Sequence, residues 1–185
     1  MPELGETGKT LGFEGPSPDL GISFLDGQII MAKIRKIIIG SDHAGFEYKN
    51  KIVEILHSKN IEVEDVGNYT NESSDYPDAG IKVGEAVSSG KVDWGILVCG
   101  SGIGMSIVAN KFPGVRAALV SDTEMAKLSR LHNNSNVLIF GERVLDSQKI
   151  SPILSAWLET DFEGGRHQRR LDKIKELEKH LYLKG

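Results

Sequence analysis

The chain is poor in several features, and each scarcity excludes a class of protein. One cysteine among 185 residues rules out an internal disulfide, so we expect a reducing compartment, the cytoplasm. No apolar run reaches the roughly 18 residues of a membrane-spanning helix, and the N-terminus lacks the basic start and apolar core of a signal peptide. Positive charge is not in excess, because the formal net charge is −4. The balance argues against a nucleic-acid partner and leaves room for a local basic pocket that binds a phosphorylated metabolite.

The composition that remains is that of a globular protein, with 39% hydrophobic and 26% charged residues. Residues 1–30 are rich in glycine and proline and show no sustained period, whereas residues 31–33 read Met-Ala-Lys, like a conventional chain start. We expect 1–30 to be an N-terminal extension, flexible or non-native, and 31–185 to be the folded domain. The alternative is a segment that folds onto the domain through Leu11, Phe13, Phe24 and Leu25.

From residue 36 onward, short β-branched runs alternate with stretches of helical apolar spacing. The predicted strands are 37–39, 61–66, 94–98, 115–120 and 136–140, with 61–66 nearer the sheet edge. The predicted helices are 44–59, 77–89, 102–111, 123–131, 148–159 and 166–181. This alternation is typical of an α/β fold, a five-stranded parallel sheet with helices on both faces.

Ligands of such folds bind at the carboxyl ends of the strands, and the polar clusters of this chain follow the predicted strands at those ends. Asp42-His43 follows the first strand, Cys99 to Gly104 the third, and Ser121-Asp122 the fourth. We therefore expect the site at this edge of the sheet.

The most informative cluster is Cys99-Gly100-Ser101-Gly102-Ile103-Gly104, which joins a buried strand to a helix. Its turn would present unpaired backbone N–H groups to an anion, and the helix dipole favours the thiolate of Cys99. The spacing matches neither a P-loop nor a dinucleotide fingerprint. The plainer interpretations are a tight turn that needs small residues and a small buried hydrophobic thiol.

Histidines and arginines supply two further candidates. Near a predicted helix end, His132 could move protons near neutral pH, although a capping role for this segment is equally simple. Arg166 and Arg170 share a helix face at a terminus where positive charge is unfavourable, which suggests a clamp for a phosphate that Arg143 could join. No two potential ligand residues have the sequence spacing that is typical of a metal site.

Taken together, these segments resemble the type B ribose-5-phosphate isomerases, in a wider family that includes galactose-6-phosphate and allose-6-phosphate isomerases. The resemblance runs from about Lys36 to the C-terminus. It is carried by Gly40-Ser41-Asp42-His43-Ala44-Gly45-Phe46, Asp75-Tyr76-Pro77, Cys99 to Gly104, Ala109-Asn110-Lys111, Arg130-Leu131-His132-Asn133 and Glu163-Gly164-Gly165-Arg166-His167.

The resemblance implies a Rossmann-like, three-layer α/β/α sandwich and an aldose–ketose isomerase that needs no metal or cofactor. It also implies a homodimer, in some relatives paired into tetramers, with the active site shared between subunits. The substrate would be a phosphorylated sugar, D-ribose 5-phosphate or D-ribulose 5-phosphate of the pentose phosphate pathway.

The implied catalytic residues are Cys99, as the base between sugar C1 and C2, and His132, which opens the furanose ring. Some relatives place a glutamate base after the glycine turn, where this chain has Met105. The implied substrate-binding residues are Asp42, His43, Tyr76, Gly100, Ser101, Gly102, Ile103, Gly104, Asn133, Arg143, Arg166 and Arg170.

Three other functions compete with this interpretation. A six-carbon sugar phosphate could be the substrate, a non-catalytic sensor could use the same fold, or Cys99 could serve a thiol hydrolase. The hydrolase is disfavoured because the sequence alone pairs no histidine with Cys99, and the sensor because the cysteine, histidine and arginine set is intact.

Overall fold

The computed structural model describes residues 23–25, 28–30 and 36–182. The chain divides into two units, Met1–Ile34 and Arg35–Gly185. Within the first unit, β1 (Ser23–Leu25) and β2 (Gln28–Ile30) pair antiparallel. The rest of the predicted extension, with the alternative contacts of Leu11 and Phe13, lies outside the described residues.

The second unit is built on a five-stranded sheet in which every neighbouring pair is parallel, as the alternation of strands and helices predicts. Its strands lie in the order β4-β3-β5-β7-β6, so the segment predicted nearer the edge does form an edge strand. The bounds are β3 (Lys36–Ser41), β4 (Glu62–Asp65), β5 (Trp94–Cys99), β6 (Ala117–Leu119) and β7 (Val137–Gly141).

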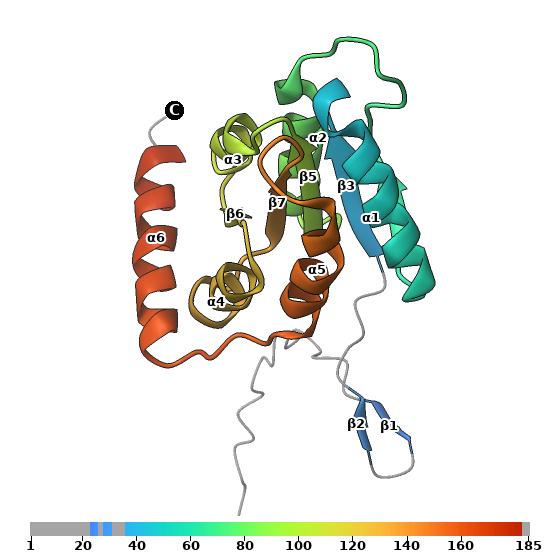
Figure 1. Ribbon diagram of the computed structural model, residues 1–185. Coiled ribbons are helices and arrows are strands. Elements are labelled where there is room, and N and C mark those ends of the chain that lie inside the picture. Colours follow the sequence, from blue (N-terminus) through green and yellow to red (C-terminus); the bar gives the residue numbers. More distant parts are fainter. Residues whose placement is uncertain (1–22, 26–27, 31–35, 183–185) are drawn as a thin grey trace, which may run out of the picture. The chain divides into compact units, whose positions relative to one another are not determined.

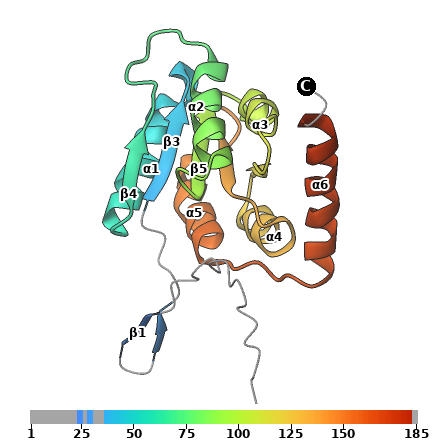
Figure 2. The ribbon, with the colours of Figure 1, turned by 180° about the vertical axis from the view of Figure 1, so that it is seen from behind.

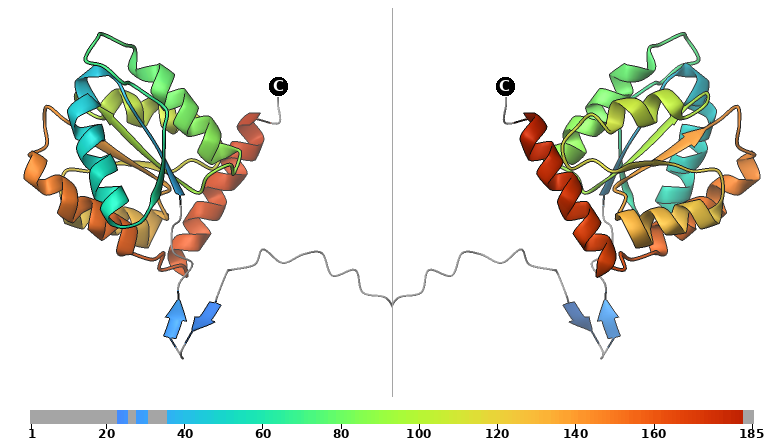
Figure 3. Two further views of the ribbon diagram at one scale, coloured as in Figure 1. Left: turned by 90° about the vertical axis from the view of Figure 1, so that its right-hand side faces the viewer. Right: turned by 90° about the vertical axis from the view of Figure 1, so that its left-hand side faces the viewer.

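Helices cover both faces of this sheet and complete three layers (Figures 1 and 2). Helices α1, α4 and α5 lie on one face and α2 and α3 on the other, while α6 stands beside α4 at the end of the sheet (Figures 1 and 3). Their bounds are α1 (Phe46–Ser58), α2 (Tyr76–Ser88), α3 (Ile103–Ala109), α4 (Thr123–Asn133), α5 (Ile150–Glu159) and α6 (Arg166–Tyr182). Within the described residues, no helix combines the length and apolarity needed to cross a membrane.

The three central strands are apolar on both sides, because helices cover both of their faces. Ile37, Ile96, Leu138 and Phe140 are fully shielded from solvent. Burying each such side chain contributes roughly 1.5–3 kcal/mol. This core fixes the strand ends from which the polar clusters project.

Element boundaries lie within two residues of those predicted, and three of the differences have a clear local reason. Helix α4 runs two residues beyond the predicted end and stops where Asn134 adopts a left-handed conformation (φ 44°). Strand β6 starts later than predicted, because the Arg116 N–H donates to the Asn136 side chain (2.7 Å). A 3-10 turn over Ser147–Lys149 precedes α5, in whose first turn Pro152 is tolerated.

Candidate active site

The glycine turn lies where β5 ends and α3 begins. Gly102 has a left-handed backbone (φ 77°), and a Cβ there would come within 2.4 Å of the Leu119 side chain, so only glycine fits. Its N–H points at the sulfur of Cys99, with 3.1 Å between nitrogen and Sγ. Cys99 is 4% exposed. The turn thus buries the thiol and donates a hydrogen bond that stabilises negative charge on it.

Two side chains from other elements flank this turn. A Cβ on Gly100 would lie 3.3 Å from Nε of Arg143, so the guanidinium of Arg143 passes over the turn. A Cβ on Gly104 would lie 2.7 Å from the Tyr76 ring, at the start of α2. The absence of side chains at these two glycines allows both groups to approach the backbone closely.

The end of β3 brings Asp42 to the same place. The Asp42 N–H donates to the carbonyl of Val98, next to Cys99. Its carboxylate does not cap the following turn, and Oδ1 is buried with no hydrogen-bond partner in the described structure. Burial raises the pKa of Asp42, and that rise is opposed by the charge of His43, by the nearby backbone N–H groups of Ala44 and Gly45, and by the charge of Arg143. Asp42 therefore holds an unused acceptor beside the glycine turn.

The loop between β4 and α2 orients His43. The Ser74 N–H lies 3.2 Å from Nδ1 of His43, and the Ser74 hydroxyl accepts from the His43 N–H (3.1 Å). The carbonyl oxygen of Ser74 lies at the same distance, 3.2 Å, from Nδ1, so Ser74 holds the His43 ring through both of its backbone polar groups and the His43 backbone through its hydroxyl.

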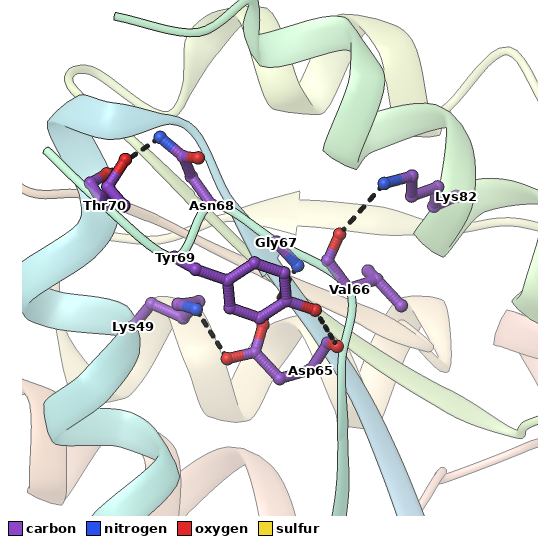
Figure 4. A network of polar contacts seen from close by, with 8 residues as sticks. All are labelled: Lys49, Asp65, Val66, Gly67, Asn68, Tyr69, Thr70 and Lys82. Atoms are coloured by element: carbon purple, nitrogen blue, oxygen red, sulfur yellow. Dashed lines mark hydrogen bonds and ion pairs between the residues drawn. The ribbon is translucent and has the colours of Figure 1, made fainter. Parts of the chain in front are cut away.

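An ion pair beneath this loop escaped the sequence analysis (Figure 4). Lys49, 1% exposed, lies 2.5 Å from Oδ2 of Asp65, while Oδ1 of Asp65 accepts from the Gly67 N–H. The carbonyl of Gly67 in turn accepts from the Ser41 N–H, adjacent to Asp42. A lysine in a helix usually indicates a solvated position, so only the tertiary structure identifies this buried ion pair.

The predicted site residues fall into two groups. The group at the carboxyl ends of the strands, here called the carboxyl-edge group, contains Cys99, Gly100, Ser101, Gly102, Ile103, Gly104, Asp42, His43, Tyr76 and Arg143. The amino-edge group contains His132, Asn133, Arg166 and Arg170.

The amino-edge group lies at the opposite end of the strands. Helix α4 carries the chain back across the sheet, and the residue just before β7, Asn136, accepts from the N–H of Gly95 at the start of β5. Strand β5 then runs from Trp94 to Cys99, five steps of about 3.3 Å each, or roughly 16 Å. Within one chain, His132 and Cys99 cannot contact the same sugar carbon.

Two further residues, His167 and Glu163, lie beside the amino-edge group, and the sequence analysis names them only as part of a motif. His167 is buried and its ring stacks on that of His132, with centroids 4.2 Å apart and planes 5° apart. Oε2 of Glu163 lies 3.9 Å from Nε2 of His132 and 3.7 Å from Nε2 of His167.

The ligand atoms of His132, Glu163 and His167 lie close enough together to suggest a metal site, which the sequence did not indicate. Two features argue against a fit. Nε–H of Arg166 donates to Nε2 of His167 (3.1 Å), which occupies the lone pair that an ion would need. The near-parallel rings also keep their in-plane lone pairs from converging on one point.

Comparison with known proteins gives a consistent result. Residues 37–174 match the model of a family described as Ribose/Galactose Isomerase. The chain is 47% identical to ribose-5-phosphate isomerase B of Escherichia coli over 145 residues, which covers 78% of this chain and 97% of that protein.

Solved structures agree in fold. Ribose-5-phosphate isomerase B of Clostridium thermocellum superposes with a TM-score of 0.77 at 50% identity, covering 79% of this chain and 99% of that one. The Mycoplasma genitalium enzyme, solved with bound ribulose-5-phosphate, gives a TM-score of 0.74 at 44% identity and covers 78% and 96% of the two chains.

Proposed function

Because this chain belongs to the ribose/galactose isomerase family, we propose that it interconverts D-ribose 5-phosphate and D-ribulose 5-phosphate in the non-oxidative pentose phosphate pathway. The observation that supports this most directly is the buried thiol of Cys99, which accepts an N–H from the glycine turn, close to Oδ1 of Asp42, a buried acceptor without a hydrogen-bond partner in the described structure. We place the reaction in the cytoplasm, where a single unpaired cysteine stays reduced.

The chemistry is a proton transfer between two carbons. Cys99 as thiolate takes the proton from C2 of the open-chain aldose, and the electron pair moves onto the carbonyl oxygen O1 to give an enediolate. The thiol then returns the proton to C1 while the O2–H proton passes to O1, which leaves the ketose. Backbone N–H groups of residues 100–104 would stabilise the enediolate, and each such donor is worth about 3 kcal/mol in other enzymes.

The remaining predicted residues bind and prepare the sugar. His132 would open the furanose ring by moving a proton between O1 and the ring oxygen, with Asn133, Asp42 and His43 binding the hydroxyl groups. Arg166 and Arg170, both exposed at the start of α6, would bind the phosphate together with Arg143. Phosphate binding far from C1 and C2 contributes through remote binding energy.

A site built from both groups of residues requires two chains. We propose a homodimer in which the amino-edge group of one subunit meets the carboxyl-edge group of the other, and pairing of such dimers into tetramers stays a prediction. The separation of His132 from Cys99 along β5 supports this arrangement. So do the apolar side chains of Ile103 and Ile107, which are 57% and 55% exposed on α3 beside the glycine turn.

The decisive experiment is an isomerase assay on the full chain with ribose, allose and galactose phosphates side by side. We expect the pentose phosphate to be preferred and Cys99→Ala to lower kcat by roughly 10²–10⁴-fold, the usual contribution of a positioned base. Calorimetric titration should show that Cys99→Ala still binds the substrate.

Lys91→Ala is the control, because Lys91 precedes β5, at the opposite end of that strand from Cys99, and pairs with Glu64. Wild-type activity in Cys99→Ala would refute the assigned base. Preference for a hexose phosphate would show that this chain is a six-carbon sugar phosphate isomerase of the same family. Binding without any turnover would favour a non-catalytic sensor.

A further inference from the structure

His167 is the one histidine of the described residues that is buried, and its ring stacks on the ring of the partly exposed His132. Its relative exposure is 2%, whereas the His132 side chain keeps 35%. The two rings are almost parallel, with 4.2 Å between centroids. One face of the His132 ring is therefore covered by a flat, fixed neighbour, while part of the ring remains open to solvent.

A turn at Gly164 and Gly165 places His167 beside His132. Gly164 and Gly165 both have left-handed backbones (φ 71° and 53°), which a side chain would strain. The resulting turn is closed by a hydrogen bond from the N–H of His167 to the carbonyl of Gly164 (2.9 Å). The N–H of Glu163 donates to the carbonyl of Leu131, next to His132, and ties the turn to the end of α4.

The ring of His167 is held in its neutral form. Nε–H of Arg166 donates to Nε2 of His167, so that nitrogen carries no proton. Burial lowers the pKa of His167, and the nearby charges of His132, Arg166 and Arg170 lower it further against the opposing effect of Glu163. A neutral ring can support His132 without repelling the proton that His132 must carry.

Glu163 adds support from the edge of the His132 ring. Its Oε2 lies within 4 Å of Nε2 in His132 and in His167. The carboxylate faces the edge of the His132 ring, while the stacked ring of His167 fixes its plane. Rotation of His132 about its side-chain bonds is thus restricted from two directions.

We propose that His167 and Glu163 are positioning residues for His132 and act on the ring-opening step alone. The inference rests on the proposed function, in which His132 opens the furanose. Proton transfer between C1 and C2 belongs to Cys99 at the other end of the strands, so misplacing His132 should leave that step intact. A catalytic group that is displaced by about 1 Å can lose roughly 10²-fold in rate even though the group itself remains.

The two steps can be measured separately. Ribulose 5-phosphate cannot close a five-membered ring because its C5 oxygen carries the phosphate. Exchange of its C1 hydrogen with D2O therefore reports proton abstraction without ring opening. Net conversion of ribose 5-phosphate, which is a furanose in solution, reports both steps. NMR follows the exchange and a coupled assay follows the conversion, both on the full chain.

In His167→Ala we expect kcat/KM for ribose 5-phosphate to fall about tenfold or more, while C1 exchange stays within about threefold of wild type. His167→Phe retains a flat ring and should recover part of the loss. Glu163→Gln, at an exposed position, should fold normally and show a smaller loss of the same selective kind. His57→Ala, which changes an exposed histidine at the end of α1, is the control and should change neither quantity.

Equal losses of exchange and conversion in folded His167→Ala or Glu163→Gln, or no loss in any of the three variants, would overturn the inference. A wild-type chain that neither isomerises nor exchanges would overturn the proposed function, and the inference with it. A selective loss of conversion in Glu163→Gln supports the inference even if both His167 variants fail to fold.

Discussion

At the scale of single residues, the site depends on polar groups that are buried without full compensation. Asp42 directly precedes a 3-10 turn, yet its side chain makes no capping bond and Oδ1 has no partner in the described structure. Leaving a buried acceptor unpaired costs about 1–3 kcal/mol. Under the proposed function, this carboxylate binds the sugar at the expense of stability.

This cost predicts a pH dependence. Burial raises the pKa of Asp42 when the chain folds, so the folded state binds the proton more tightly than the unfolded state. The penalty is absent while Asp42 is protonated in both states, and it grows as pH rises from the unfolded pKa through the folded one. Asp42→Asn should therefore raise Tm at neutral pH, by roughly 2–4 °C for each kcal/mol relieved.

Thermal unfolding between about pH 4 and pH 8 tests this prediction, since the advantage of the variant should shrink toward acid. Asp93→Asn, at an exposed position before β5, is the control and should show no such trend. A difference in Tm that stays constant with pH would contradict the assigned burial penalty.

At the scale of elements, the glycine turn and the end of α4 show how local conformation places chemistry. The turn after β5 requires Gly102 for two reasons at once, its left-handed backbone and its contact with Leu119 from β6. The end of α4 is fixed by Arg130, whose guanidinium donates to the Asn134 side chain and to the Ser135 carbonyl. Burial, assisted by the charge of Arg116, lowers the pKa of Arg130 to about 10, so it remains protonated at neutral pH.

Comparing Gly102→Ala with Gly90→Ala separates the need for a left-handed backbone from the contact with Leu119. We expect unfolding free energy to fall by more than the 1–2 kcal/mol or so that a left-handed alanine costs, because the added Cβ also meets Leu119. Gly90→Ala is the matched control, since Gly90 has a similar φ of 72° with no atom within 4 Å of the added Cβ. Denaturant titration should show the larger loss, and the assay the larger drop in kcat, for Gly102→Ala. Equal effects in both variants would contradict the packing argument.

At the scale of the whole molecule, the arrangement of the two residue groups is the main result. Helix α4 starts at the carboxyl edge, where the Asp122 side chain accepts from the Met125 N–H, and ends at the amino edge with His132. Helix α6 then begins beside it with the two arginines. The proposed function therefore depends on contact between chains.

Subunit complementation tests this dependence. Cys99→Ala and His132→Ala should each be nearly inactive, yet together regain roughly a quarter of wild-type activity, because half of randomly formed dimers are mixed and one of their two sites is intact. Cys99→Ala combined with Arg143→Ala is the control, since both changes fall in the carboxyl-edge group and no mixed dimer has an intact site. Activity no higher than that of the parents in the first mixture would contradict the shared site.

Much of this architecture could be predicted from local patterns. The β-branched runs, the helical spacing of the intervening segments and the glycine-rich turn predict five strands, six helices and a thiol at a strand end, and all are present. Boundaries agree to within two residues, and the differences at Arg116 and His132 depend on a side-chain hydrogen bond and a left-handed residue that periodicity does not report.

The sequence by itself determined the fold class, the family and which residue types gather in short motifs, because these depend on local spacing and on resemblance. Only the tertiary structure decided the strand order, the burial of Lys49 and the stacking of His167 under His132, because each depends on contacts between segments far apart in the chain. It also decided that Cys99 and His132 lie at opposite ends of the strands, since the direction in which α4 crosses the sheet is set by packing.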